Sequence, residues 1–184
     1  MFQTLSRIGK ALTEAGVGWA VGASVLLNRY NLAENPNDLD LLVCVEGAEK
    51  AAGLLAAMGE TIPCVQSATY ATRFFRKFRI DGTDVDMMAG FAINHPEGRY
   101  EYVFDDVSVA SLEEMECAPV PFAALEDWYV VYQLIPGKEY KAVRIEEYLL
   151  RCGIGHPYLL ERALSGCLPD CVRMRIEALL ARQG

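Results

Sequence analysis

The amino-acid sequence predicts an α+β protein with a C-terminal helical extension. One sign is the amphipathic pattern of residues 2–15, in which apolar side chains recur three and four positions apart, as on one face of a helix. Another is a pair of strand-like runs on either side of Asp81-Gly82, a dipeptide typical of a two-residue hairpin turn. After Pro119 and Pro121 only helix-like segments follow.

The length and composition fit a packed globular protein. A chain of 184 residues suits one domain, or a compact core with an extension, and 52% of its residues are hydrophobic. We expect a core domain over residues 1–120 and a helical region over residues 121–184. No apolar run approaches the roughly 18 residues of a membrane span, and no signal-peptide pattern is present. We therefore expect a cytoplasmic protein without a membrane partner.

The charge and the cysteines exclude two further classes of site. A formal net charge of −8 argues against an extended nucleic-acid surface, because phosphate backbones are held mainly by Lys and Arg. A single nucleotide needs only local positive groups and is compatible with this charge. The six cysteines contain no C-x-x-C pair, so zinc-ligand spacing is absent. We expect free, mostly buried thiols in a reducing compartment.

A strand, a small-residue turn and a helix follow the N-terminal helix. Trp19-Ala20-Val21 is the expected strand, Gly22-Ala23-Ser24 the turn, and a helix is expected from Val25 to Tyr30. Where a strand passes through a tight turn into a helix, backbone N–H groups point outward unpaired, which suits an anion. Ser24 adds a hydroxyl at this turn. Its alternative role is that of a plain helix N-cap.

Two carboxylates one residue apart open the apolar strand Asn37-Asp38-Leu39-Asp40-Leu41-Leu42-Val43. Strand side chains alternate between faces, so Asp38 and Asp40 point the same way. Neighbouring carboxylates repel each other and are unfavourable to bury unpaired, and a divalent cation such as Mg²⁺ resolves both problems. Taken alone, the pair fits a metal site and a solvated strand end equally well.

A second acidic strand follows the Asp81-Gly82 turn. In Thr83-Asp84-Val85-Asp86-Met87-Met88 the side chains of Asp84 and Asp86 share one face. If the two acidic strands are neighbours in one sheet, three or four carboxylates converge, which favours the metal-site interpretation. The preceding strand carries basic residues that are either solvated edge charges or, for one or two of them, within reach of a triphosphate. They are Arg73, Arg76, Lys77 and Arg79.

The remaining segments read as one helix, short strands and then a helical tail. Residues 46–58 form an Ala-rich helix, 61–65 a short strand or extended loop, and 91–120 short strands and loops. Helices are expected at 123–134, 139–152, 157–164 and 170–182. The first of these has an aromatic face with Trp128, Tyr129 and Tyr132, which suits the core and is also placed to line a ligand cleft.

Together these motifs resemble the polymerase-beta-like nucleotidyltransferase superfamily. Its pattern is an apolar strand, G-[GS], a helix, Asp-x-Asp before apolar residues, and a third carboxylate on a later strand. Here the pattern is carried by Val21-Gly22-Ala23-Ser24-Val25-Leu26-Leu27, by the Asp38–Asp40 strand and by Asp86, over roughly residues 17–90. The segment looks most like small bacterial stand-alone members related to aminoglycoside and abortive-infection nucleotidyltransferases. The resemblance implies a nucleotidyltransferase fold, in which a mixed β-sheet is flanked by helices.

The resemblance also implies a role for each motif residue. Asp38 and Asp40 would bind two Mg²⁺ ions, and Asp86 would bind the catalytic ion and help to deprotonate the acceptor hydroxyl. Gly22, Ala23 and Ser24 would hold the β- and γ-phosphates of an NTP.

Two positions depart from the family pattern. Ala23 replaces the second small residue of G-[GS], so Ser24 supplies the hydroxyl instead. The Arg that often precedes Asp-x-Asp in relatives is missing, and Arg29 on the preceding helix is the candidate replacement for nucleotide binding. Asp84 lies nearer the hairpin turn. We expect it either to lie next to the metal-binding carboxylates without binding the metal, or to be a surface charge.

The sequence thus predicts a Mg²⁺-dependent nucleotidyltransferase that moves NMP from an NTP, such as ATP, to a hydroxyl of a small molecule or a protein. Two metal ions can stabilise the attacking and leaving oxygens of such an in-line displacement. The acceptor would lie between the sheet and the helical region. One alternative is a catalytically inactive nucleotide- or partner-binding module with the same fold. Another is a structural protein whose acidic strands lie at the surface.

Overall fold

Seven strands form the central sheet of the protein. The structure, a computed structural model, describes residues 1–65 and 67–182. In spatial order the strands are β3 (Glu60–Ile62), β4 (Phe74–Ile80), β5 (Thr83–Ala89), β2 (Asp38–Val43), β1 (Trp19–Val21), β9 (Val120–Ala123) and β8 (Val109–Glu113). The pairs β2–β5 and β1–β9 are parallel, and the other neighbours are antiparallel. The sheet is therefore mixed, as predicted.

The hairpin between β4 and β5 follows from its turn residues. Asp81 and Gly82 have φ values of 49° and 73°, the left-handed conformations that a two-residue hairpin of this kind requires. Gly meets this requirement without steric cost, and Asp is among the residues that tolerate it best. The two strands then pair along their whole length, from Ile80 opposite Thr83 to Phe74 opposite Ala89. The predicted hairpin is confirmed.

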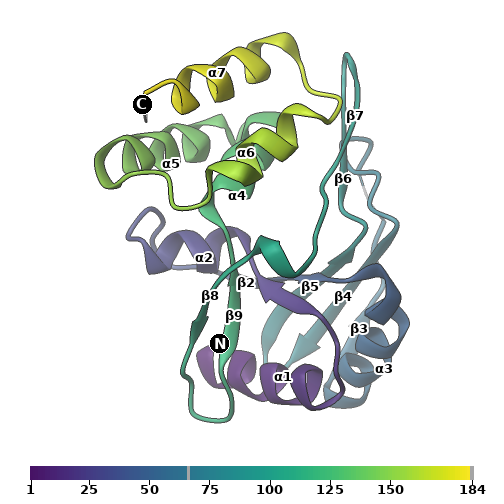
Figure 1. Cartoon of the computed structure of the whole chain (residues 1–184). Coiled ribbons are helices and arrows are strands. Elements are labelled where there is room, and N and C mark those ends of the chain that lie inside the picture. The colour runs from purple at the N-terminus through teal and green to yellow at the C-terminus, as the bar shows by residue number, and fades with distance from the viewer. Residues whose placement is uncertain (66, 183–184) are drawn as a thin grey trace.

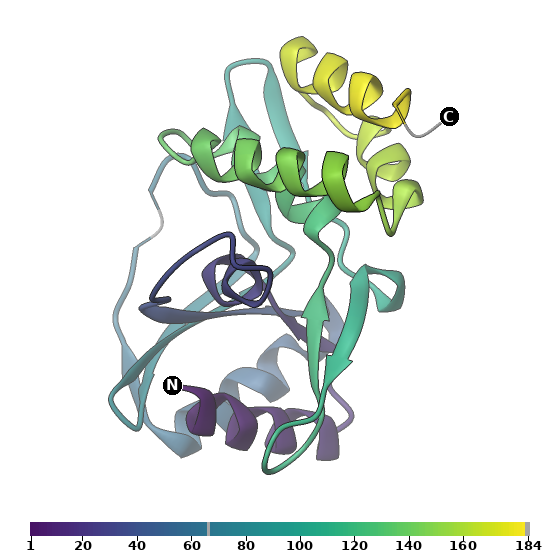
Figure 2. The same ribbon diagram turned by 90° about the vertical axis from the view of Figure 1, so that its left-hand side faces the viewer.

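Helices cover both faces of the sheet (Figures 1 and 2). On one face lie α1 (Phe2–Glu14) and α3 (Ala48–Met58), and on the other lies α2 (Ala23–Arg29). Two short 3-10 turns, η1 (Val45–Gly47) and η2 (Asp106–Ser108), lie in the connections. Helix α1 buries Leu5, Ile8 and Leu12, which form the stripe that its periodicity predicts. The amphipathic N-terminal helix is thus confirmed.

Four helices form the C-terminal extension beyond α2 (Figure 1). They are α4 (Leu125–Leu134), α5 (Glu139–Cys152), α6 (Pro157–Leu164) and α7 (Asp170–Leu180). Helix α4 is their centre, because all of its residues except Gln133 are buried. A separate hairpin, β6 (Ala92–His95) with β7 (Gly98–Glu101), rises beside these helices, and His95 Nε2 lies 3.0 Å from the carbonyl oxygen of Cys167.

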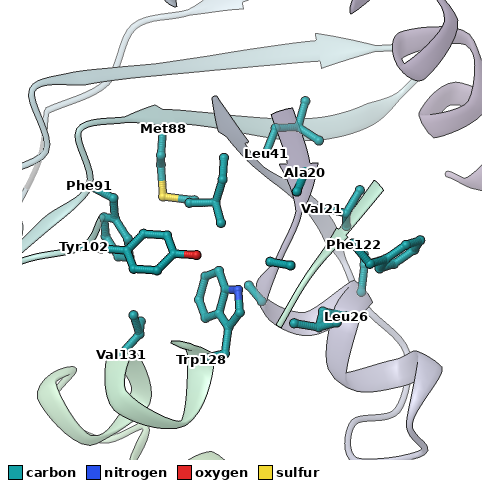
Figure 3. Packing of buried hydrophobic residues seen from close by; sticks show 14 of the residues in the cluster. Ala20, Val21, Leu26, Leu41, Met88, Phe91, Tyr102, Phe122, Trp128 and Val131 are labelled. Carbon is teal, nitrogen blue, oxygen red and sulfur yellow. The ribbon is translucent and has the colours of Figure 1, made fainter. Parts of the chain in front are cut away.

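Trp128 joins the helical extension to the sheet. Figure 3 shows its ring rising from α4 between Leu26 on one side and Met88 and Phe91 on the other. The ring packs so tightly against the turn after β1 that a Cβ atom at Gly22 would lie 2.2 Å from Trp128 Cζ2. Only glycine fits at this position. The Gly22 turn is therefore shaped by packing against α4 as well as by the strand-to-helix connection.

The starts of α2 and α4 are among the boundaries that differ from the sequence-based expectation. Helix α2 begins at Ala23 rather than at Val25, so Ser24 lies inside the first turn and is not the N-cap; Gly22 occupies that position in an extended conformation. The sheet continues to Ala123, because β9 pairs with both β1 and β8. Helix α4 then begins at Leu125.

The six cysteines are free, as expected, but the expectation that they are mostly buried is wrong. Cys44 and Cys64 are half-buried, and the other four are exposed. They lie in connections and on the outer faces of the C-terminal helices, which contribute little to the core. In the part of the chain that the structure describes, no helix combines the length and the apolar character needed to cross a membrane.

Candidate active site

Four aspartates lie on one face of the sheet, on two neighbouring strands. Strands β2 and β5 run parallel, with Asp38 opposite Asp84 and Asp40 opposite Asp86. Residues in register, and residues two apart on one strand, point to the same face. Three of the four, Asp38, Asp40 and Asp86, line a cleft. The carboxylate of Asp84 instead pairs with Arg79 at 2.8 Å near the hairpin turn.

The cleft has a volume of about 380 Å³ and is lined from both the sheet and the helical extension. We call one side the sheet wall; it consists of Asp38, Asp40, Lys77 and Asp86 on β2, β4 and β5. We call the other the helical wall; it consists of Trp128, Tyr132, Lys138 and Lys141 on α4, α5 and the turn between them. Further lining residues include Ser24 of α2, Tyr70 of the β3–β4 connection and Phe91, which lies between β5 and β6.

Asp40 lies at the centre of the acidic cluster. The pKa of its carboxyl group is raised to about 7. Burial is the largest cause, and the charges of Asp38 and Asp86 also contribute. Lys141 and Lys77 oppose this effect only in part. A carboxyl group whose charged form is disfavoured by two like charges is stabilised when a cation is added. The lysines of the protein therefore compensate the negative charge of the sheet wall only in part.

Asp86 has a cationic neighbour of its own. Its Oδ1 lies 3.1 Å from Nζ of Lys77, the residue opposite it on β4. Burial raises the pKa of Asp86, and the hydrogen bond and charge of Lys77 counteract that rise. Lys77 is thus the one of the three basic β4 residues that lines the cleft, among the residues that the structure describes, and Arg73 lies just before this strand.

The turn after β1 is held directly beside the acidic strand. The N–H of Gly22 donates to the carbonyl oxygen of Asp40 at 3.0 Å, and Ala23 has a left-handed φ of 47°. Ser24 Oγ is shielded from solvent and has no hydrogen-bond partner among residues 1–65 and 67–182. A shielded hydroxyl without a partner is unfavourable, so a ligand in the cleft that bonds to it would be stabilised.

The helical wall combines aromatic rings with ammonium groups. The ring centroids of Trp128 and Tyr132 are 5.2 Å apart, and Lys141 Nζ lies 4.9 Å from the Tyr132 centroid. Burial and the neighbouring charge of Lys138 lower the pKa of Lys141, while Asp40 and Asp38 raise it. Lys141 therefore lies within electrostatic reach of the sheet wall.

Arg29, the predicted nucleotide-binding arginine, is not brought to the cleft. Its guanidinium donates to Ser111 Oγ at 2.8 Å, pairs with Glu113 and stacks 5.0 Å from the Phe122 ring. These partners lie on β8 and β9, at the edge of the sheet. The basic groups that do line the cleft, besides Lys77, are Lys138 and Lys141, which sequence reasoning did not select. The only local signal for them is their position just after the Pro136-Gly137 break.

The donor chemistry of the sheet wall suits a divalent cation. Mg²⁺ takes carboxylate oxygens together with water and phosphate oxygens. Within the described residues, no group of three or more His, Cys, Asp or Glu side chains is arranged to hold a metal ion by itself. The three carboxylates of the sheet wall would therefore need further ligands, such as phosphate oxygens and water, to hold such an ion.

Comparisons with solved structures identify the fold. No protein-family profile and no curated protein sequence matches this chain. A candidate nucleotidyltransferase of Thermotoga maritima superposes with a TM-score of 0.59 at 19% identity, over 81% of this chain and 92% of that one. The chain has the nucleotidyltransferase fold. The antibiotic-resistance factor ANT(2″)-Ia, solved with adenylyl-2″-tobramycin, has a TM-score of 0.56 at 10% identity, over 96% of this chain and 97% of that one.

A third neighbour with this fold is the lincosamide antibiotic adenylyltransferase LnuA, solved with lincomycin. It has a TM-score of 0.52 at 12% identity and covers 79% of this chain and 96% of its own. At these identities the likeness concerns the fold, and the activity has to be inferred from the residues of the cleft. The predicted mixed sheet, flanking helices and helical extension all belong to this nucleotidyltransferase fold.

Proposed function

We propose that the protein is a nucleotidyltransferase that moves NMP from an NTP to a hydroxyl group of an acceptor. The parallel register of β2 and β5 supports the proposal most strongly, because it places Asp38, Asp40 and Asp86 together in one cleft. The three carboxylates, Lys77 and a hydroxyl at the turn after β1 are groups that suit NTP binding and transfer. The fold agrees with this assignment.

In this proposal Asp38, Asp40 and Asp86 hold two Mg²⁺ ions with the triphosphate. When bound, such ions stabilise the charge on the attacking and leaving oxygens of the displacement. The protein's own contribution is to hold the reactants on a rigid strand pair, where misplacement is small. The parallel pairing of β2 with β5 keeps the three carboxylates in fixed relative positions.

The remaining steps fall to side chains already in place. The acceptor oxygen bonds to the α-phosphorus while the bond from that phosphorus to the bridging oxygen breaks and pyrophosphate leaves. Asp86, whose Oδ1 lies 3.1 Å from Lys77 Nζ, would accept the proton of the acceptor hydroxyl. Ser24 Oγ donates to a phosphate oxygen, and Lys77 offsets the negative charge of the triphosphate. Gly22 and Ala23 supply the backbone of this phosphate-binding turn.

We further propose that the acceptor is a small molecule, that ATP is a substrate and that the protein works in the cytoplasm. LnuA is a lincosamide antibiotic adenylyltransferase solved with lincomycin, and ANT(2″)-Ia is an antibiotic-resistance factor solved with adenylyl-2″-tobramycin. A cleft of about 380 Å³ between sheet and helices suits a ligand of that size class. A protein acceptor would have to present an extended segment to the same space.

Transfer can be tested on the full chain with Mg²⁺, α-labelled NTPs and a set of hydroxyl acceptors, by following pyrophosphate release and labelled product. We expect Asp40→Asn to abolish transfer, because the central carboxylate of the cluster is lost. Asp84→Asn is the matched control, since Asp84 lies on the same face but outside the cleft, and it should retain activity. Activity that survives in Asp40→Asn would show the assignment to be wrong. Mg²⁺-dependent NTP binding without transfer to any acceptor would indicate the inactive binding module instead.

A further inference from the structure

The helical wall presents its own ammonium groups to the cleft. Lys138 and Lys141 lie three positions apart at the start of α5, and both line the cleft. Lys141 Nζ lies 4.9 Å from the centre of the Tyr132 ring and 3.5 Å from its hydroxyl oxygen. An aromatic face is where a cationic ligand group usually binds. Here that position is already taken by a cation of the protein.

With metal ions bound to the sheet wall, no carboxylate among the described lining residues is left for a cationic ligand. Among the described residues that line it, the acidic ones are the three aspartates of the sheet wall, which the proposed function assigns to transfer. The buried acids at the start of α4 are satisfied elsewhere. Glu126 accepts from the backbone N–H of His156 at 2.9 Å, and Asp127 accepts from the Tyr102 hydroxyl at 2.9 Å. A ligand ammonium would therefore have no free carboxylate to pair with.

Part of the uncharged lining is a row of aromatic rings. Tyr70 stacks on Phe91 with ring centroids 6.2 Å apart, Phe91 lies 6.3 Å from Trp128, and Trp128 lies 5.2 Å from Tyr132. All four residues line the cleft. Figure 3 shows Phe91 and Trp128 meeting between the sheet and α4. This row of rings offers stacking surface to a flat or apolar ligand body.

We propose that the acceptor is a hydroxyl compound with an aromatic or apolar body that is uncharged or anionic, and that Lys138 and Lys141 disfavour cationic acceptors such as aminoglycosides. The inference rests on the proposed function and adds the class of acceptor to it. An ammonium group near α5 would be repelled by two lysines, whereas a carboxylate there would be attracted by both. Interactions of this kind set specificity more than overall affinity.

A matched set of probes isolates the charge of the ligand. The p-nitrophenyl β-D-glucoside, the corresponding glucuronide and the 6-amino-6-deoxy glucoside share one aromatic body and differ only at carbon 6. We would titrate each into the full chain with Mg²⁺ and a non-hydrolysable ATP analogue, by calorimetry. The expected order of affinity is glucuronide, glucoside, amine, with about tenfold or more between the first and last. The double variant Lys138→Gln/Lys141→Gln should remove this order. Lys10→Gln, an exposed lysine of α1 that pairs with Glu14, should keep it.

Each other result overturns the inference. Tighter binding of the amine than of the glucuronide would contradict the charge preference, and so would binding of none of the three probes at millimolar concentration. An unchanged order in the double variant would remove the two lysines as its cause. Glucuronide that displaces the ATP analogue, instead of binding beside it, would assign the lysines to the triphosphate. Failure of the ATP analogue itself to bind would reject the proposed function, and is recognised because it is measured before any probe is added.

Discussion

Asp40 in the sheet wall and Asp127 behind the helical wall are two carboxyl groups with the same raised pKa of about 7 and different surroundings. Burial is the largest cause of the rise in both. Asp40 also faces the charges of Asp38 and Asp86. Asp127 also feels like charges, from Glu126 and Asp105, which raise its pKa. It differs in that it accepts from the Tyr102 hydroxyl and lies 3.6 Å from Arg162 Nη2, and both contacts lower its pKa.

The difference shows that the cause of a pKa shift, rather than its size, marks a ligand site. A carboxyl group surrounded by like charges lacks a cation, and a bound ion would lower its pKa. A buried carboxyl group with a hydroxyl donor and a nearby arginine already has its partners. The sheet wall is thus built to receive charge, and the interior behind the helical wall is built to hold α4 and α6 together. Four measurements test this contrast, in order of decreasing expected effect.

Removing the contact between the two walls should have the largest effect. Trp128 is buried against the Gly22 turn, Leu26 and Phe91, so Trp128→Ala leaves a large cavity between α4 and the sheet. We expect the free energy of unfolding to fall by about 3–5 kcal/mol, measured by urea denaturation. Trp128→Phe keeps an aromatic ring and should lose much less. Equal stability of the alanine variant and the parent chain would show that α4 does not depend on this contact.

A substitution in the sheet wall should lower the transfer rate without lowering the stability of the fold. Asp86→Asn removes a carboxylate that faces Asp40 and pairs with Lys77, and we expect the transfer rate to fall at least about hundredfold. Its stability should be unchanged or higher, because one repulsive charge is gone. Asp84→Asn, on the same strand and face, should change the rate little. Comparable losses of rate in both variants would mean that the cleft does not distinguish the two aspartates.

The pH dependence of stability should separate the two raised carboxyl groups. Between the unfolded pKa near 4 and the folded pKa of about 7, folded Asp127 retains a proton that the unfolded chain has lost. The folded state then binds more protons, so the free energy of unfolding falls as pH rises, by up to about 1.4 kcal/mol per pH unit, and levels off above the folded pKa. Asp40 should add a similar slope in the absence of a divalent cation.

Urea denaturation over that pH range measures both slopes. Asp127→Asn should remove the contribution of Asp127 to the slope with or without Mg²⁺, because an amide does not titrate. The fold should be kept, because the amide oxygen still accepts from the Tyr102 hydroxyl. Addition of Mg²⁺ should flatten the slope that remains, because a bound ion lowers the pKa of Asp40. Asp40→Asn should make stability insensitive to Mg²⁺ in this range. If Mg²⁺ flattened the slope equally in Asp40→Asn, the ion would be acting elsewhere.

The sheet wall could be predicted from sequence because local rules determine most of it. Alternation along a strand places Asp38 with Asp40 and Asp84 with Asp86, and the Asp81-Gly82 turn defines the hairpin. The choice of Asp86 over Asp84 rests on the superfamily pattern. Asp86 lines the cleft whereas Asp84 pairs with Arg79, and the catalytic role of Asp86 stays a prediction. The neighbourhood of β2 and β5 is a non-local contact that no local rule predicts.

The helical wall could not be predicted in the same way. Lys138 and Lys141 reach the cleft because α5 packs on α4 and α4 packs on the sheet, which is a property of tertiary structure. In sequence they are ordinary charges at the start of a helix. Arg29 shows the reverse case. Its place on the helix after the phosphate-type turn was readable, but its direction depends on β8, whose Glu113 and Ser111 hold its guanidinium.

The smallest expected effect concerns Ser24, whose hydroxyl is shielded and has no partner among the residues that the structure describes. Ser24→Ala removes an unsatisfied polar group, so the free protein should be as stable as the parent chain or more stable, by up to about 1 kcal/mol. Binding of an NTP with Mg²⁺ should weaken about three- to tenfold, because the hydrogen bond to phosphate is lost.

Ser111→Ala is the control, with the opposite expected effect on stability. The Ser111 hydroxyl accepts from Arg29 at 2.8 Å outside the cleft, so its loss should lower stability and leave NTP affinity unchanged. Calorimetric titration and urea denaturation of both variants give the two quantities. A Ser24→Ala protein that is less stable, with unchanged NTP affinity, would place this hydroxyl in the fold and not in the site.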